Sequence, residues 1–101
     1  MSIEATERTA RVRGGGSTRR AIARIDHALA ASISRNAFSR DQALRTLEDI
    51  EGDIGDPALA DRAAAVVNAA AASYRGEAVV DRGRFLDALL DIRALLVGHQ
   101  P

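Results

Sequence analysis

Residues 39–59, SRDQALRTLEDIEGDIGDPAL, carry the signals that decide the fold. Ser39 is followed three residues later by Gln42, which is the spacing of a capping box at the start of a helix. Gly55 can end this helix, and Asp56 followed by a proline is an N-cap with proline at the first helical position. Two helices joined by so short a turn pack against each other, so this stretch predicts a helical hairpin.

Apolar residues recur at helical spacing in four segments of the chain. We expect the first helix to begin at Ser17 or Thr18 and to end near Asn36, and the last to begin after the N-cap Asp81 and to end at Gly98. The four predicted stripes are Ile22, Ile25, Leu29 and Ile33; Ala43, Leu47, Ile50 and Ile54; Leu59, Ala63, Val66, Ala70 and Tyr74; and Phe85, Leu89, Ile92 and Leu96. The sequence therefore predicts an all-α fold, either a small four-helix bundle or a pair of packed helical hairpins.

Glycines separate an N-terminal arm from these stripes. Gly14 to Gly16, followed by a serine, have the composition of a flexible linker. We therefore expect residues 1–17 to form a flexible arm and residues 18–98 to form a single helical domain.

The composition excludes several classes of chemistry. The 101 residues contain no Cys, and all 14 basic residues are Arg. There is consequently no disulfide, thiolate nucleophile, zinc ribbon, Schiff-base lysine or P-loop lysine. The Ala and Arg bias is typical of a GC-rich bacterial or phage genome. The start of the chain is acidic and lacks an apolar segment, so we expect a cytoplasmic protein without a secretory signal.

No arrangement of residues predicts an active site or a metal site. Asp49-Ile-Glu51-Gly52-Asp53 is rich in acids, but its glycine is misplaced for a calcium loop and no Glu closes twelve residues. We expect no enzyme activity, no cofactor, no metal, no membrane contact and no small-molecule substrate.

His27 carries a partial resemblance to a known family. The stretch His27-Ala-Leu-Ala-Ala-Ser32 resembles the His-x-Leu-Lys-Gly-Ser motif of histidine phosphotransfer domains, with Ala30 and Ala31 at the Lys and Gly positions. His27 points away from the predicted apolar stripe, with Arg20 and Arg24 on the same outer face. The resemblance implies phosphotransfer through His27 as a lesser alternative function.

Charge is concentrated in two opposite regions. Residues 1–24 hold six Arg and two Glu, whereas residues 46–61 hold six acids and no Arg. An acidic patch of four residues falls near the negative end of the second helix, where acids are unfavourable. It consists of Glu48, Asp49, Glu51 and Asp53. We expect a partner for this patch, either the arm, a neighbouring subunit or another protein.

The basic region supports a nucleic-acid hypothesis. A flexible cationic arm can neutralise phosphates without reading a base sequence. The arginines concerned are Arg8, Arg11, Arg13, Arg19, Arg20 and Arg24. The alternative function is therefore an oligomeric, phage-type DNA-handling or packaging accessory protein that contacts nucleic acid through this arm.

The last helix is apolar over an unusually wide arc. Besides its core stripe, it carries a second stripe consisting of Leu86, Leu90, Arg93 and Val97. Either this is the central helix of the bundle, or the second stripe packs against another copy, with Asp87, Asp91 or the acidic patch of that copy facing Arg93. We expect a non-enzymatic, small helical protein-interaction module (an adaptor, regulator or assembly component) that self-associates or binds another protein.

Overall fold

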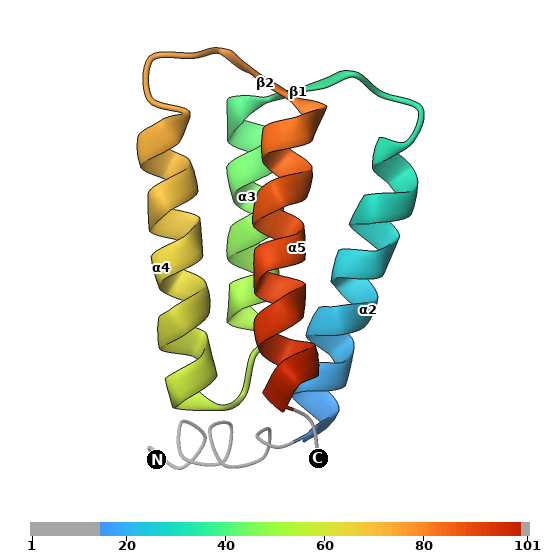
Figure 1. Cartoon of the computed structure of the whole chain (residues 1–101), viewed down its shortest axis with the longest axis vertical. Helices are drawn as coiled ribbons and strands as arrows, with labels where there is room; N and C mark the ends of the chain where they lie inside the picture. Colours follow the sequence, from blue (N-terminus) through green and yellow to red (C-terminus); the bar gives the residue numbers. More distant parts are fainter. Residues whose placement is uncertain (1–14, 100–101) are drawn as a thin grey trace, which may run out of the picture.

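The computed structural model describes residues 15–99 and is a four-helix bundle, as predicted. Its elements are α2 (Gly15–Ser32), β1 (Ala37–Ser39), α3 (Arg40–Gly52), α4 (Pro57–Ser73), β2 (Val79–Asp81) and α5 (Arg82–His99). Successive helices run in opposite directions, and both strands lie at the same end of the bundle (Figure 1). The all-α prediction is therefore confirmed, with one small addition: a two-stranded sheet.

Three of the four predicted N-caps are confirmed, because each side chain accepts a hydrogen bond from the first turn of its helix. The fourth, Ser17 or Thr18, is wrong, since α2 already begins at Gly15. The Ser39 hydroxyl accepts from the backbone N–H of Gln42 at 3.1 Å. The Asp56 carboxylate accepts from two N–H groups of α4, the nearer at 2.8 Å. Asp81 accepts from the N–H of Arg84 at 3.1 Å. Three helix starts thus follow from local chemistry alone.

The strand pair joins the connection between α2 and α3 to the connection between α4 and α5. Phe38 pairs with Val80 at the centre of an antiparallel ladder. On either side of the ladder, the N–H of Arg40 donates to the carbonyl of Ala78 and the N–H of Arg82 donates to that of Asn36, both at 2.9 Å. The sequence analysis did not predict these strands, because three residues are too few to show alternation.

These contacts reveal an internal two-fold relation. The interval from Phe38 to its partner Val80 also separates the two N-caps, Ser39 and Asp81, and the equivalent donors Arg40 and Arg82. Applied along the chain, the same interval relates α2 to α4 and α3 to α5 without insertion or deletion. The bundle therefore consists of an N-terminal half, residues 15–55, and a C-terminal half, residues 57–97, of equivalent architecture.

The predicted core stripes are confirmed completely for α3 and α5. All eight of their residues are buried: Ala43, Leu47, Ile50, Ile54, Phe85, Leu89, Ile92 and Leu96. In α4 the predicted stripe is correct except that Val67 is buried in place of Val66. The rings of Phe38 and Phe85 lie with their centroids 4.8 Å apart and link the sheet to the helices.

The prediction for α2 is partly wrong. The helix begins at Gly15 and ends at Ser32, so Ile33 falls in the following turn and faces solvent. Of the predicted stripe only Ile25 is fully buried, and the rest of the inward face is built from small residues, Thr18, Ala21 and Ser32. The second helix also ends earlier than predicted, at Gly52.

Candidate functional surfaces

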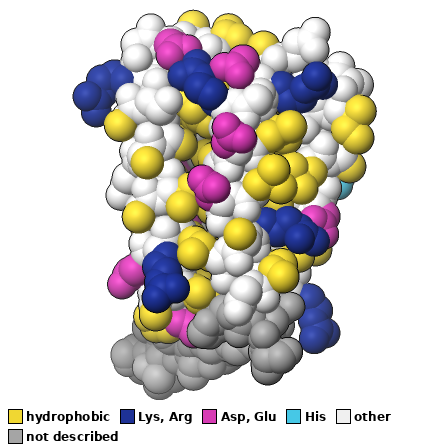
Figure 2. Space-filling model, viewed as in Figure 1, with side chains coloured by type: hydrophobic (Ala, Val, Ile, Leu, Met, Phe, Trp, Pro, Cys, Tyr) yellow, Lys and Arg dark blue, Asp and Glu magenta, His cyan; other side chains and the backbone are white. Residues whose placement is uncertain are grey.

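One side of the bundle carries an apolar surface formed by α2 and α5, which we call the α2/α5 face. Four residues at the same spacing come from each side: Ile22, Asp26 and Leu29 of α2 with Ile33 of the turn that follows it, and Leu86, Leu90, Arg93 and Val97 of α5. Ile33, Leu90 and Val97 have exposed fractions of 74%, 48% and 43%. Hydrophobic side chains gather over the boundary between the two helices (Figure 2). Large apolar groups are therefore in contact with water here.

An ion pair crosses the middle of this face. The Nε of Arg93 donates to Oδ1 of Asp26 at 2.8 Å, and both side chains remain partly exposed. This hydrogen bond and the negative charge of the carboxylate raise the pKa of Arg93. The acid that pairs with Arg93 thus comes from α2 of the same chain, whereas the sequence analysis considered only Asp87, Asp91 and the acidic patch of a neighbouring copy.

The end of the face nearest the sheet is hollowed. A depression of about 630 Å³ lies between Leu29 and Ile33 on one side and Leu86 on the other. The guanidinium of Arg82 closes its end by donating to the carbonyl of Ile33 at 2.8 Å. The face therefore offers a concave apolar surface as well as protruding side chains.

The equivalent surface in the other pairing of helices, α3 with α4, is different. At the positions of Ile22, Leu29 and Leu90 the internal relation places Ala64, Ala71 and Glu48. Ile33 corresponds to Arg75, Arg93 to Glu51 and Val97 to Gly55. Apart from Leu44, which corresponds to Leu86, these positions carry small, polar or charged residues on the α3/α4 side. On the α2/α5 face they carry large aliphatic residues and the ion pair of Asp26 with Arg93.

The acidic patch is partly neutralised within the chain. The Nε of Arg24 on α2 donates to Oδ2 of Asp53 at 2.6 Å, which raises the pKa of Arg24. Glu48 and Asp49 are exposed on α3, and Glu51 is half-buried. One member of the patch is therefore paired with a residue of the helical domain itself, whereas the partners expected for it were the arm, a neighbouring subunit or another protein.

The arginines proposed to contact nucleic acid are only partly described. Arg8, Arg11 and Arg13 lie outside the described residues. Arg19 and Arg20 are exposed on the first turns of α2, whereas Arg24 is paired with Asp53. The nucleic-acid hypothesis stays a prediction.

His27 is exposed on α2, as its position on the helical wheel predicted. Its side chain lines a groove between α2 and α3, together with Arg24 and Ala31. Arg20 is not among the residues that line this groove. The phosphotransfer hypothesis also stays a prediction.

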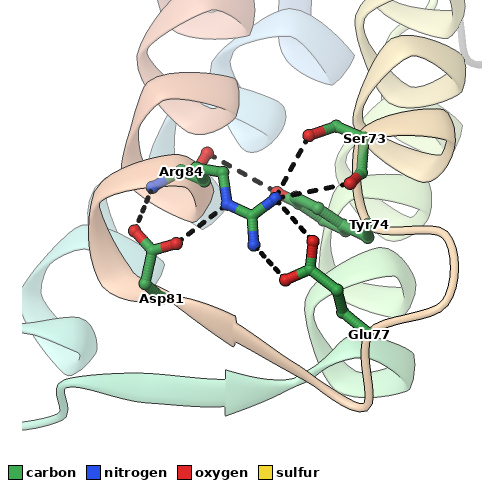
Figure 3. Close-up of polar contacts among 5 residues, drawn as sticks. All are labelled: Ser73, Tyr74, Glu77, Asp81 and Arg84. Atoms are coloured by element: carbon green, nitrogen blue, oxygen red, sulfur yellow. Dashed lines mark hydrogen bonds and ion pairs between the residues drawn. The ribbon is translucent and has the colours of Figure 1, made fainter.

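The polar cluster around Arg84 escaped the sequence analysis (Figure 3). Its guanidinium binds both carboxylate oxygens of Glu77, Oδ1 of Asp81 at 2.8 Å, and the carbonyl and hydroxyl of Ser73, both at 3.3 Å. It also lies 5.6 Å from the ring centroid of Tyr74. These hydrogen bonds lower the pKa of Glu77 and of Asp81. Every group here is engaged, so the cluster holds the turn before β2 in place.

The turns that lead into β1 and β2 do not have the composition of calcium loops, which need several oxygen ligands. Residues 33–36, before β1, contain no carboxylate, and the one acid of residues 75–78, Glu77, is bound to Arg84. Within residues 15–99, no group of three His, Asp or Glu side chains is placed to hold a metal ion.

In the same part of the chain, no helix combines the length and apolar character needed to cross a membrane.

Comparison with known proteins does not identify a relative. The chain matches no protein-family model, no curated protein and no solved structure. Its function must therefore be argued from the surfaces described above.

Proposed function

We propose that this protein is a non-enzymatic helical interaction module that self-associates through the α2/α5 face. The observation that carries the proposal is the contrast between equivalent positions. Leu90 is exposed where the other half has Glu48, and Ile33 is exposed where it has Arg75. Because the bundle tolerates charged residues at these positions, folding alone does not require large aliphatic side chains there.

Exposed aliphatic side chains gain free energy when another surface covers them. Transfer of apolar area out of water contributes about 25 cal/mol per Å². Soluble monomers usually avoid contiguous apolar patches. The exposed parts of Ile33, Leu90 and Val97 lie on one face, so a single partner surface can cover all three.

The charges of the face favour a second copy of the chain as the partner. Asp26 and Arg93 are the charged members of the two stripes, and they pair with each other. The stripes are therefore neutral overall and can meet their own copy across a two-fold axis without repulsion between like charges. Such an interface also leaves the ion pair intact, so no charge loses its partner on association.

Substitution of Leu90 by Glu tests this proposal, because it introduces the residue found at the equivalent position of the other half. Sedimentation velocity over a dilution series should show a dimer for the unmodified chain and a folded monomer for Leu90→Glu. The matched control is Ala72→Glu, which adds the same charge at an exposed position of α4, away from the face. This control should remain a dimer.

Two results would overturn the proposal. One is a monomer for the unmodified chain at every concentration. The other is a dimer that persists in Leu90→Glu, since that would place the interface elsewhere. Circular dichroism of each variant establishes that loss of association is not loss of folding.

A further inference from the structure

A second surface, separate from the α2/α5 face, is a groove between the two helices of the N-terminal half. Its volume is about 230 Å³. Ala28 and Ala31 line it from α2, and Gln42, Ala43 and Thr46 line it from α3. Small side chains leave the space between the helices open, so the groove reaches the buried rings of Phe38 and Phe85. Its floor is therefore aromatic and apolar.

The rim of the groove carries hydrogen-bond donors that have no acceptor among residues 15–99. The guanidinium of Arg35 lies 5.0 Å from the ring centroid of Phe38. Within residues 15–99, Arg35 forms no ion pair, and the side chains of His27 and Gln42 form no hydrogen bond. One full positive charge and two further donor groups therefore face the same space.

The charged residues make the two ends of the groove electrostatically different. Arg35 lies at the end nearest the sheet, whereas Asp49 lies near the other end, beside the Arg24 that is bound to Asp53. An anionic group is therefore attracted at the sheet end and repelled at the opposite end.

The equivalent groove of the C-terminal half shows that this lining is not a requirement of the fold. Ala69 stands there in place of His27, and Ala88 stands in place of Thr46. Arg84 takes the position of Gln42, but its donors are occupied by Glu77, Asp81 and Ser73. Unused donors above an aromatic floor thus occur in only one of the two grooves.

From this contrast we infer that the groove between α2 and α3 binds a small carboxylate with an apolar body. The carboxylate accepts hydrogen bonds from Arg35 and from His27 or Gln42, and the apolar body contacts Phe38 and Phe85. A guanidinium suits a carboxylate because its parallel N–H groups match the two oxygens. The sequence analysis did not anticipate a small-molecule ligand, because these residues come from two helices and a turn.

The volume of the groove limits the size of the ligand. Pockets for drug-sized molecules usually measure about 300–1,000 Å³, whereas this groove measures about 230 Å³. A single ring or a short branched chain fits that space. Benzoate combines such a body with one negative charge, so it is the probe of choice, with an expected Kd on the order of 1 mM.

The test is a titration of the full ¹⁵N-labelled chain with benzoate, followed by amide chemical shifts. We expect saturable shifts confined to residues around the groove, such as Ala31, Phe38 and Gln42. Benzamide, which has nearly the same shape but no charge, and inorganic phosphate, which has no apolar body, should each bind at least about tenfold more weakly.

Two variants and a control locate the binding. Arg35→Gln removes the cation, and Ala31→Leu fills the groove from an exposed position on α2. Each should weaken benzoate binding about tenfold or more. Arg45→Gln removes an exposed arginine of α3 that does not line the groove, and it should leave the affinity unchanged.

Several outcomes would overturn the inference. These are the absence of saturable benzoate shifts, phosphate or benzamide binding as tight as benzoate, and benzoate binding that survives both variants. Because Leu90→Glu lies on the other surface, the same titration of that variant should give the unmodified affinity. The inference about the groove and the proposed self-association therefore fail or succeed independently.

Discussion

Leu47 and Leu89 occupy equivalent positions in the two halves of the bundle, and both are fully buried. The next residues along the chain, Glu48 and Leu90, are also equivalent, and both are exposed, yet one is charged and the other aliphatic. At these two positions the halves share the inward residue and differ in the outward one, although other inward pairs differ, such as Ser32 and Tyr74. Packing constrains the buried leucine, whereas the exposed position accepts a charged residue in one half and an aliphatic residue in the other.

The turns differ in the same way. In the C-terminal half, Glu77 binds Arg84 and holds the turn that leads into β2. At the position of Glu77 the N-terminal half has Arg35, and at the position of Arg84 it has Gln42. The charges of one turn thus pair within that turn, whereas Arg35 in the other turn has no carboxylate partner among residues 15–99. The two halves therefore differ in the charges of these turns as well as in their outward residues.

Truncation of the two equivalent leucines should have the largest effect on stability. It tests whether equivalent buried positions contribute equally in the two halves. Leu47→Ala and Leu89→Ala each remove a fully buried side chain from the shared core. Each should lower the free energy of unfolding by about 2–5 kcal/mol. Chemical denaturation measures both values, with Arg45→Ala as the control, because this exposed residue of α3 lies outside the core and the α2/α5 face and its truncation should change stability far less. If only one of the two substitutions lowers the free energy of unfolding, the two positions do not contribute equally to the core.

Local interactions explain what the sequence could predict. N-caps act within one turn, so Ser39, Asp56 and Asp81 predicted three helix starts correctly. The core faces of α3 and α5 contain large aliphatic residues, so their periodicity was also unambiguous. Local chemistry and strong hydrophobic contrast were sufficient for this part of the fold.

The inward face of α2 could not be predicted from hydrophobicity. It contains Thr18, Ala21 and Ser32, while the larger Ile33 lies in solvent. The strand pair and the ion pair of Asp26 with Arg93 depend on contacts between distant segments, which periodicity cannot show. Of the candidate surfaces, the sequence indicated the second stripe of α5 but not the contribution of α2 to the same face.

Transfer of the aliphatic residue to the other half should have an intermediate effect and would sharpen the comparison. Glu48→Leu places on α3 the residue that α5 has at Leu90. The new side chain lies one turn from the half-buried Leu44, so the α3/α4 side gains an apolar patch. We expect Glu48→Leu to form assemblies larger than the dimer. Association through the α3/α4 side should be about tenfold tighter than in the unmodified chain.

Sedimentation velocity at several concentrations measures this change. Asp61→Leu is the control, because it replaces an exposed acid of α4 outside the equivalent face. If Asp61→Leu promotes assembly as strongly as Glu48→Leu, general surface hydrophobicity is responsible, and the comparison of equivalent positions loses its force.

The smallest expected effect concerns the charges that hold the C-terminal turn. Arg84→Gln introduces the residue found at the equivalent position, Gln42, and removes the cation that lowers the pKa of Glu77 and of Asp81. These groups are exposed, so at neutral pH the melting temperature should fall by only a few degrees.

A carboxylate with a lowered pKa in the folded state stabilises the protein above its ordinary pKa, about 4.3 for Glu and 3.9 for Asp. This stabilisation is lost as the pH falls through the lowered value. The melting curves of the unmodified chain and of Arg84→Gln should therefore differ above about pH 5 and converge towards about pH 2. Arg75→Gln, in the same turn but without an ion pair among residues 15–99, should show no such convergence. A difference that stays constant with pH would mean that Arg84 stabilises the turn through its contacts with Tyr74 and the Ser73 carbonyl, and not through the two carboxylates.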